Sequence, residues 1–223
     1  MIGIIVAMES EASAIYDKMT CVSVKTIGGK RFTKGRLGGK KVVVALAGIG
    51  KINASYTTTI LIREFAPSFV INTGIAGGLG RVKALGVVVG TSVVQHDMDT
   101  SPLGDPVGYI SGVGVINIDC DEKLSNLLAS GVKEPVRGVV ACGDQFIADA
   151  SRVKKIVDTF DAVACDMESG AVAQVAYMSG VPFGIIRVIS DDGGDNAQVS
   201  YNELCIKATE INSQVVVNAI AGL

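Results

Sequence analysis

The chain has 223 residues, of which 48% are hydrophobic and 19% charged, and its 20 Lys and Arg against 22 Asp and Glu give a net charge of −2. This size and composition exclude a disordered chain and predict one globular domain that covers residues 1–223. A nearly neutral charge without a basic run argues against nucleic acid or an anionic membrane as a partner.

The five cysteines are an odd number without any C-x-x-C pair, so we expect neither a disulfide framework nor a zinc site, and reduced thiols indicate the cytoplasm. The N-terminal segment is typical of a buried strand rather than a signal peptide, because the acidic Glu9 and Glu11 follow it at once. No apolar run approaches the roughly 18 residues that a membrane helix needs.

Short runs rich in Val and Ile predict strands covered on both faces. In chain order they are residues 2–7, 42–46, 69–72, 87–94, 138–142, 162–165 and 183–189. Residues 21–37 alternate around Gly28 and Gly29, which predicts a hairpin with one solvated face. Helical spacing predicts helices at 9–19, 51–65, 121–129, 151–159, 168–179 and 202–221. The alternation predicts an α/β three-layer sandwich, with a mostly parallel, mixed central sheet flanked by helices.

Two glycine-rich loops follow predicted strands. The first, Gly48-Ile49-Gly50-Lys51, has Ile52 where a phosphate-binding loop has Ser or Thr, and it lacks the third glycine of a dinucleotide site, which argues against a Rossmann oxidoreductase. The second, residues 72–80, has four glycines that allow the backbone to approach a flat ligand closely. The alternative for each loop is an ordinary tight turn.

Three carboxylates follow predicted strands: Glu11, Glu168 and Asp191. Each alone is explained equally well by capping of a helix N-terminus, but three at one edge of a sheet indicate a functional site. The single histidine, His96, has no ligand set around it, so no metal is expected.

Six segments, in order along nearly the whole chain, resemble the nucleoside phosphorylase/nucleosidase superfamily, and most closely the bacterial methylthioadenosine/S-adenosylhomocysteine nucleosidases. They are residues 2–11, 48–51, 71–79, 143–147, 166–168 and 187–191. The resemblance implies hydrolysis of the N-glycosidic bond of an adenine nucleoside by a homodimer, without any cofactor.

The resemblance also implies roles for individual residues. Glu11, assisted by Arg187, activates the attacking water. Asp191, supported by Ser190, protonates adenine N7, while Glu168 accepts hydrogen bonds from the ribose hydroxyls. These residue types suit the chemistry, because the sugar gains positive charge and the leaving base gains negative charge.

The same resemblance implies which residues bind the substrate. Phe146 stacks on the adenine, the backbone of Ile147 contacts its edge, and Met167 lies under the ribose. The remaining residues assigned to the site are Gly77 in the second glycine-rich loop, Met8, Ile49 and Tyr201 around the 5′ substituent, and Leu103, which reaches into a neighbouring subunit's pocket.

Three alternatives stay open at this point. A phosphorolytic enzyme of the same fold needs cationic or backbone donors for phosphate, whereas Glu9 and Glu11 would repel it. A non-catalytic nucleoside sensor would be expected to lack one of the three carboxylates. A futalosine-type nucleosidase differs only in the 5′ group of its substrate. Two departures from the family pattern bear on that group. Ile75 stands where many relatives have Ser, and the loop 96–109 carries Pro102 and Pro106.

Overall fold

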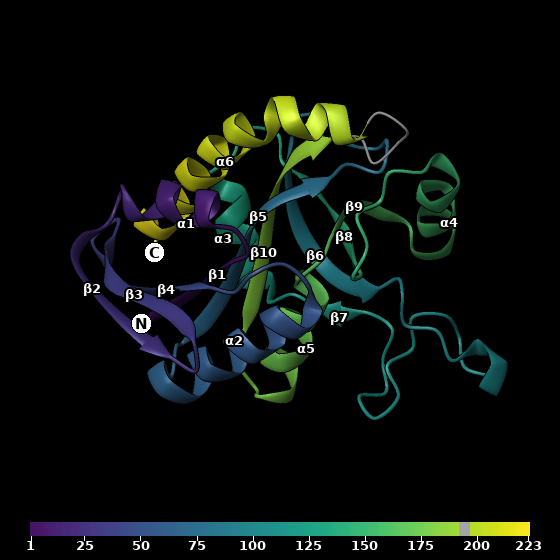
Figure 1. Cartoon of the computed structure of the whole chain (residues 1–223), viewed down its shortest axis with the longest axis horizontal. Coiled ribbons are helices and arrows are strands. Elements are labelled where there is room, and N and C mark those ends of the chain that lie inside the picture. Colours follow the sequence, from purple (N-terminus) through teal and green to yellow (C-terminus); the bar gives the residue numbers. More distant parts are fainter. Residues whose placement is uncertain (192–196) are drawn as a thin grey trace.

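The structure is a computed structural model that describes residues 1–191 and 197–223, without the side chains of residues 197–200. Strands and helices alternate along most of the chain (Figure 1). The strands are β1 (Ile2–Val6), β2 (Thr20–Ile27), β3 (Lys30–Leu37), β4 (Lys40–Leu46), β5 (Phe69–Gly77), β6 (Val87–Gln95), β7 (Ile118–Asp119), β8 (Val136–Cys142), β9 (Ala162–Asp166) and β10 (Phe183–Asp191). The helices are α1 (Glu9–Tyr16), α2 (Lys51–Phe65), the short 3-10 helix η1 (Ser101–Leu103), α3 (Glu122–Ser130), α4 (Ala150–Phe160), α5 (Ser169–Met178) and α6 (Ala197–Ala221).

The described strands form one mixed sheet. Its central pairings β4–β1, β1–β5 and β5–β10 are parallel, as are β6–β8 and β8–β9. Antiparallel pairing joins β2 to β3, β3 to β4, β7 to β6 and β10 to β6, while β5 and β9 meet at the single pair Gly77↔Cys165. Because β10 pairs with both β5 and β6, this half of the sheet curls into a closed ring of five strands, β5, β9, β8, β6 and β10.

Helices cover both faces of the sheet. In Figure 1 α1, α3 and α6 lie on the upper side, α2 and α5 lie side by side below, and α4 packs at one end against β8 and β9. All residues of β1 and β10 are buried, as strands between two helical layers must be. The predicted helix-covered α/β sheet is therefore confirmed, and its curled half is a feature that the order of elements did not predict.

Several predicted bounds need correction. The hairpin 21–37 is part of a larger antiparallel unit, since β3 turns at Gly38 and Gly39 into β4 and pairs with it from Arg31 to Leu37. The second glycine-rich segment is largely strand: β5 runs on to Gly77, where it pairs with Asp191 of β10. Helix α6 begins at Ala197 rather than at residue 202. None of the helices in the described part of the chain has the length and apolar character to cross a bilayer.

Candidate active site

One cavity of about 460 Å³ opens where several strands of the sheet end. Its walls come from the residues that follow β1 and β8, from the last residues of β5, β9 and β10, from α1 and α6, and from the residues just before α2 and α5. The residues that line it are Ala7, Met8, Glu11, Ile49, Ile75, Ala76, Gly77, Gln145, Phe146, Ile147, Cys165, Asp166, Met167, Glu168, Ser190, Asp191, Tyr201 and Asn202. The ends of β-strands in α/β folds are the usual place for a ligand site.

The structure brings together nearly all residues that the sequence assigned to the site. Met8, Glu11, Ile49, Gly77, Phe146, Ile147, Met167, Glu168, Ser190, Asp191 and Tyr201 all line the cavity. The exceptions are Arg187, which lies buried beneath it, and Leu103, which is 84% exposed on a protruding loop.

Glu11 is held in the cavity wall by the backbone. Its Oε2 accepts hydrogen bonds from the N–H groups of Ala7 and Met8, both at 3.0 Å, and its Oε1 accepts one from Ile75, also at 3.0 Å. A Cβ atom at Gly74 would collide with Oε1, so glycine is needed there for the carboxylate to fit. Burial raises the pKa of Glu11, although the Met8 N–H and the charge of Arg187 act in the opposite direction. The result is a rigid, desolvated carboxylate.

Glu168 lies at the junction of β9 and α5, 8% exposed. Its Oε1 accepts a hydrogen bond of 2.9 Å from the N–H of Gly50 at the start of α2. Burial, and next to it the negative charge of Asp166, raise the pKa of Glu168 to about 7. This carboxylate can therefore change its protonation state near neutral pH.

Asp191 ends β10 and is 3% exposed. The hydroxyl of Ser190 donates a hydrogen bond of 2.9 Å to its Oδ2. A Cβ at Gly77 would stand 3.0 Å from Asp191 Oδ1 and 3.2 Å from Cys165 Sγ, so the absent side chain leaves the room in which the carboxyl group sits. Ser190 and Gly77 thus fix the orientation of Asp191 at the cavity.

Arg187 does not contact Glu11 through any hydrogen bond that the described residues show. Its Nε and Nη2 bind Asp166 Oδ2 at 2.8 and 2.7 Å, and the same Nη2 donates a short hydrogen bond to Asn72 Oδ1. The guanidinium is 1% exposed. Burial favours the neutral form, but the charges of Asp166, Glu168 and Glu11 keep the pKa of Arg187 above its ordinary value. Arg187 acts on Glu11 through its charge rather than through a hydrogen bond, and its assistance of Glu11 in catalysis stays a prediction.

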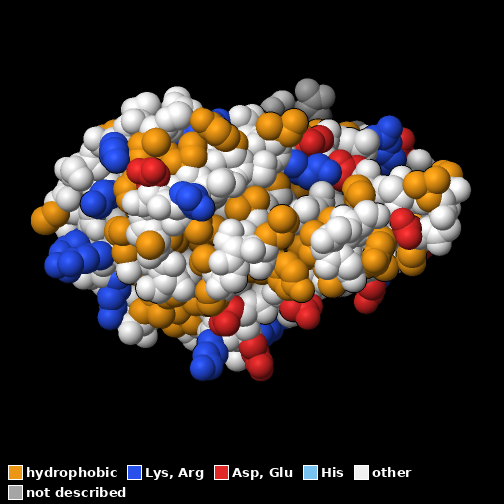
Figure 2. All heavy atoms as spheres, turned by 90° about the horizontal axis from the view of Figure 1, so that it is seen from below, with side chains coloured by type: hydrophobic (Ala, Val, Ile, Leu, Met, Phe, Trp, Pro, Cys, Tyr) orange, Lys and Arg blue, Asp and Glu red, His pale blue; other side chains and the backbone are white. Residues whose placement is uncertain are grey.

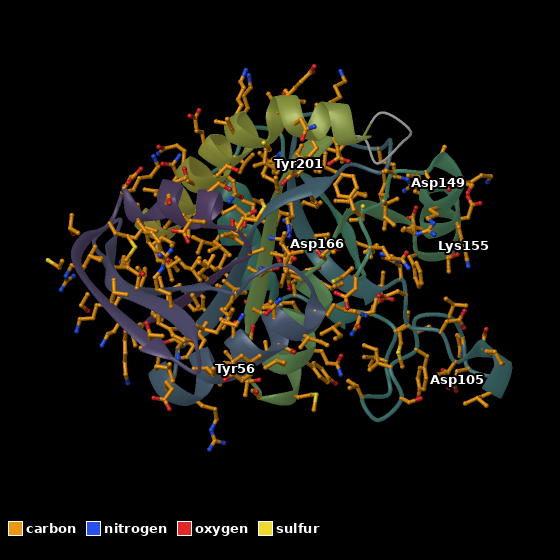
Figure 3. The ribbon with its side chains drawn as sticks, in the orientation of Figure 1. Tyr56, Asp105, Asp149, Lys155, Asp166 and Tyr201 are labelled. Carbon is orange, nitrogen blue, oxygen red and sulfur yellow. The ribbon has the colours of Figure 1, made fainter. Side chains whose placement is uncertain are left out.

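An aromatic pair closes one side of the cavity. Phe146 and Tyr201 meet edge to face with their ring centroids 5.8 Å apart, and the Tyr201 hydroxyl lies 3.5 Å from the sulfur of Met8. Phe146 is 48% exposed and hence accessible to a ligand, whereas the side chain of Ile147 is 4% exposed. Figure 3 shows Tyr201 on α6 above Asp166, near the middle of the molecule.

The first glycine-rich loop connects the Glu168 side of the cavity with the 143–147 segment. The N–H of Lys51 donates to Asp144 Oδ1 at 2.7 Å, and the Lys51 ammonium group pairs with Asp97 at 2.7 Å. Asp97 in turn accepts a hydrogen bond from the N–H of Asp144 at 2.9 Å. This loop is therefore more than an ordinary turn, since it presents the Gly50 N–H to Glu168.

Reasoning from the sequence missed Asp166 and Asn72. Both are buried, and both bind Arg187. Asp166 carries the same signal as the three carboxylates that were recognised, an acid at the end of a strand, so it could have been found. Asn72 gave no comparable signal, because its partner is 115 residues away along the chain.

Comparison with known proteins identifies the family. A model of the phosphorylase superfamily matches residues 1–221. The methylthioadenosine/S-adenosylhomocysteine nucleosidase of Shewanella halifaxensis is 38% identical, over 97% of this chain and 96% of the relative. The chain belongs to this nucleosidase family of the phosphorylase superfamily. The resemblance inferred from the six sequence segments is thereby confirmed.

Solved structures of this family and a related one share the fold. A Helicobacter pylori nucleosidase variant with methylthioadenosine in its active site has a TM-score of 0.96 and 32% identity, covering 100% of this chain and 98% of that one. The futalosine hydrolase of Helicobacter pylori has a TM-score of 0.95 and 32% identity, covering 100% and 97%. Fold alone therefore does not separate these two substrate classes.

Proposed function

We propose that this protein hydrolyses the N-glycosidic bond of methylthioadenosine and S-adenosylhomocysteine, releasing adenine and the corresponding thioribose. The observation that carries the proposal is the position of Glu11, Glu168 and Asp191, which three separate parts of the chain bring to one cavity of about 460 Å³. That volume lies in the range of pockets for small molecules such as a nucleoside. The family relationship supports the same reaction.

On the sugar side, Glu11 orients and activates water. The backbone N–H groups at 3.0 Å hold both of its oxygens, so the carboxylate does not have to reorganise when the water attacks. Its pKa is raised and therefore lies closer to the pKa of an effective base at neutral pH. Glu168, when ionised, accepts hydrogen bonds from the ribose hydroxyls and stabilises the positive charge that develops on the ring.

On the base side, Asp191 donates a proton to adenine N7 as the bond breaks. The Ser190 hydroxyl donates a hydrogen bond of 2.9 Å to Asp191 Oδ2, and Asp191 Oδ1 lies beside Gly77 in the cavity wall. Phe146 stacks on the adenine, the backbone of Ile147 contacts its edge, and Met167 lies under the ribose. Met8, Ile49 and Tyr201 surround the 5′ substituent.

Water rather than phosphate is the nucleophile in this proposal. The nucleophile position is occupied by a buried carboxylate, Glu11, which would repel a phosphate dianion. Phosphorolysis would need cationic donors there, and the nearby Arg187 is already paired with Asp166.

A futalosine-type nucleosidase is the second candidate, favoured by the structural match to the futalosine hydrolase. One experiment separates these reactions: the pure protein is incubated with methylthioadenosine, S-adenosylhomocysteine, deoxyadenosine and futalosine in phosphate-free buffer, and again with phosphate. Free thioribose and adenine without phosphate support the proposal. Ribose 1-phosphates that form only with phosphate would show a phosphorylase, and turnover of futalosine alone would show the second candidate.

We infer that the protein acts as a homodimer. The side formed by α2 and α5 exposes Ile52, Tyr56, Tyr177 and Met178, and Figure 2 shows hydrophobic side chains gathered across the face that is seen from this direction. Such a patch is typical of a protein interface. The loop that carries η1 extends away from the body of the molecule, as the position of Asp105 in Figure 3 shows, so Leu103 is available to a neighbouring subunit.

Two measurements test the dimer. Sedimentation should give a dimer at micromolar concentration, and a fully active monomer would contradict the inference. Leu103 is 84% exposed in its own subunit, so Leu103→Ser should leave the melting temperature of that subunit unchanged. It should raise KM for methylthioadenosine, because Leu103 contributes to the partner's pocket. An unchanged KM would exclude Leu103 from the partner's pocket.

A further inference from the structure

We propose that Asp166 is a positioning residue, which holds Arg187 below the cavity with one carboxylate oxygen and the start of α5 with the other. The inference rests on the proposed function, because the groups that Asp166 positions are those assigned to water and ribose. Asp166 lines the cavity, and no role for it follows from the reaction described above.

The two oxygens of Asp166 serve different elements. Oδ2 binds the Nε and a terminal nitrogen of Arg187 on β10, at 2.8 and 2.7 Å. Oδ1 accepts hydrogen bonds from the Ser169 hydroxyl at 2.7 Å, the Ser169 N–H at 3.1 Å and the Glu168 N–H at 3.3 Å. One carboxylate therefore fixes Arg187 relative to the backbone of Glu168.

This pairing decides which carboxylate Arg187 binds. Asp166 and Arg187 are almost completely buried, with side-chain exposures of 1% and 2%, and a buried cation requires a partner. The nearby alternatives are Glu11 and Glu168, whose charges also act on Arg187. With Asp166 in place, Arg187 neutralises charge below the cavity and leaves the oxygens of Glu168 available to the ribose. Without it, Arg187 would turn toward Glu168 and withdraw that carboxylate from the substrate.

Asp166 also affects the protonation of Glu168. The charged and titratable groups around Glu168 come from every element packed against it: Asp166 from β9, Arg187 from β10, Glu11 from α1, Tyr201 from α6 and Cys142 from β8. The Gly50 N–H adds a hydrogen bond from α2. After burial, Asp166 is the largest of the influences that raise the pKa of Glu168 to about 7. Removing its charge while Arg187 stays would lower that pKa.

The test compares the pH dependence of kcat/KM for methylthioadenosine in the wild type and in Asp166→Asn. Glu168 must be ionised to bind the ribose, so the wild-type rate should rise with pH through about 7. In Asp166→Asn this rise should move at least about one pH unit lower, because a neighbouring negative charge is lost. At pH 8 kcat/KM should fall on the order of tenfold or more, because Arg187 and Glu168 are displaced.

Two further variants complete the experiment. Ser169→Ala removes the 2.7 Å hydrogen bond to Asp166 but leaves the charge of Asp166 in place. The melting temperature should therefore be lower, while kcat/KM should still rise with pH near 7. If Asp166→Asn does not fold, Arg187→Lys tests the same network, since lysine keeps the charge but cannot bind Asp166 twice and Asn72 as well. Its kcat/KM should fall on the order of tenfold or more, and an unchanged value would overturn the proposal.

The outcomes separate this inference from the proposed function. A wild type that does not release adenine in phosphate-free buffer refutes the function itself. An active wild type together with a folded Asp166→Asn protein that keeps the wild-type pH profile refutes only the positioning role. A lower melting temperature as the sole effect of Asp166→Asn would likewise reduce Asp166 to a structural residue.

Discussion

Ionised Glu168 should lower the free energy of unfolding of the substrate-free protein at the pH where the reaction runs. Burial and the charge of Asp166 raise its pKa from 4.5 to about 7, a shift that corresponds to about 3 kcal/mol between its two protonation states. In the folded protein the proton is retained up to about pH 7, whereas the unfolded chain releases it near 4.5. The stabilisation is therefore complete below pH 4.5 and is lost as the pH rises through about 7.

Glu168→Gln removes this pH dependence. The amide cannot ionise, and its oxygen can still accept the 2.9 Å hydrogen bond from Gly50. We therefore expect the variant to gain up to about 3 kcal/mol over the wild type at pH 8 and much less at pH 5, while its turnover is largely lost.

Urea unfolding of both proteins at several pH values between 5 and 8 measures the difference in the free energy of unfolding. The matched control is Glu9→Gln, which neutralises an acid of α1 whose side chain is 59% exposed. If Glu168→Gln is no more stable than the wild type at pH 8, or if the difference is the same at pH 5, the reasoning about Glu168 is wrong.

Three further variants test the remaining groups. Glu11→Gln should lower kcat by about 10²–10⁴ because the base is lost, whereas Glu9→Gln should remain active; similar rates for the two variants would remove Glu11 from the mechanism. Asp191→Asn should lose about 10²–10⁴ in turnover of methylthioadenosine but little on a nucleoside whose leaving group needs no protonation, and equal losses on both would exclude the acid role. Gly74→Ala places a Cβ against Glu11, so kcat should fall with little change in KM, and a wild-type kcat would show that Glu11 can move.

Much of the fold followed from local patterns in the sequence. Runs rich in Val and Ile marked the buried strands, and the carboxylates at their ends marked the edge of the sheet that carries the cavity. The closure of half the sheet did not follow, because β10 pairs with both β5 and β6, and no periodicity within β10 says which neighbours it has. The early start of α6 at Ala197 was missed for a similar reason, since its apolar spacing was recognised only from residue 202 onward.

The residues of the site likewise fall into those that the sequence predicted and those that it did not. Glu11 and Glu168, which follow strands, and Asp191, which ends one, are brought together by the topology and could be named from the sequence. That Asp166 and Asn72 both bind Arg187 could not be predicted, because the three residues lie on strands far apart along the chain and their approach depends on how β5, β9 and β10 meet. Leu103 was assigned to a neighbouring subunit's pocket; it does not line the cavity of its own subunit, and its place in a partner's pocket stays a prediction.

The way in which Glu11 is held has an evolutionary consequence. All three hydrogen bonds to its oxygens come from main-chain nitrogens, those of Ala7, Met8 and Ile75, whose side chains form part of the cavity wall. Mutation at these three positions alters the shape and polarity of the binding site without removing any group that anchors the base. Substitutions that change the substrate preference can therefore accumulate at these positions while Glu11 keeps its place in the cavity wall.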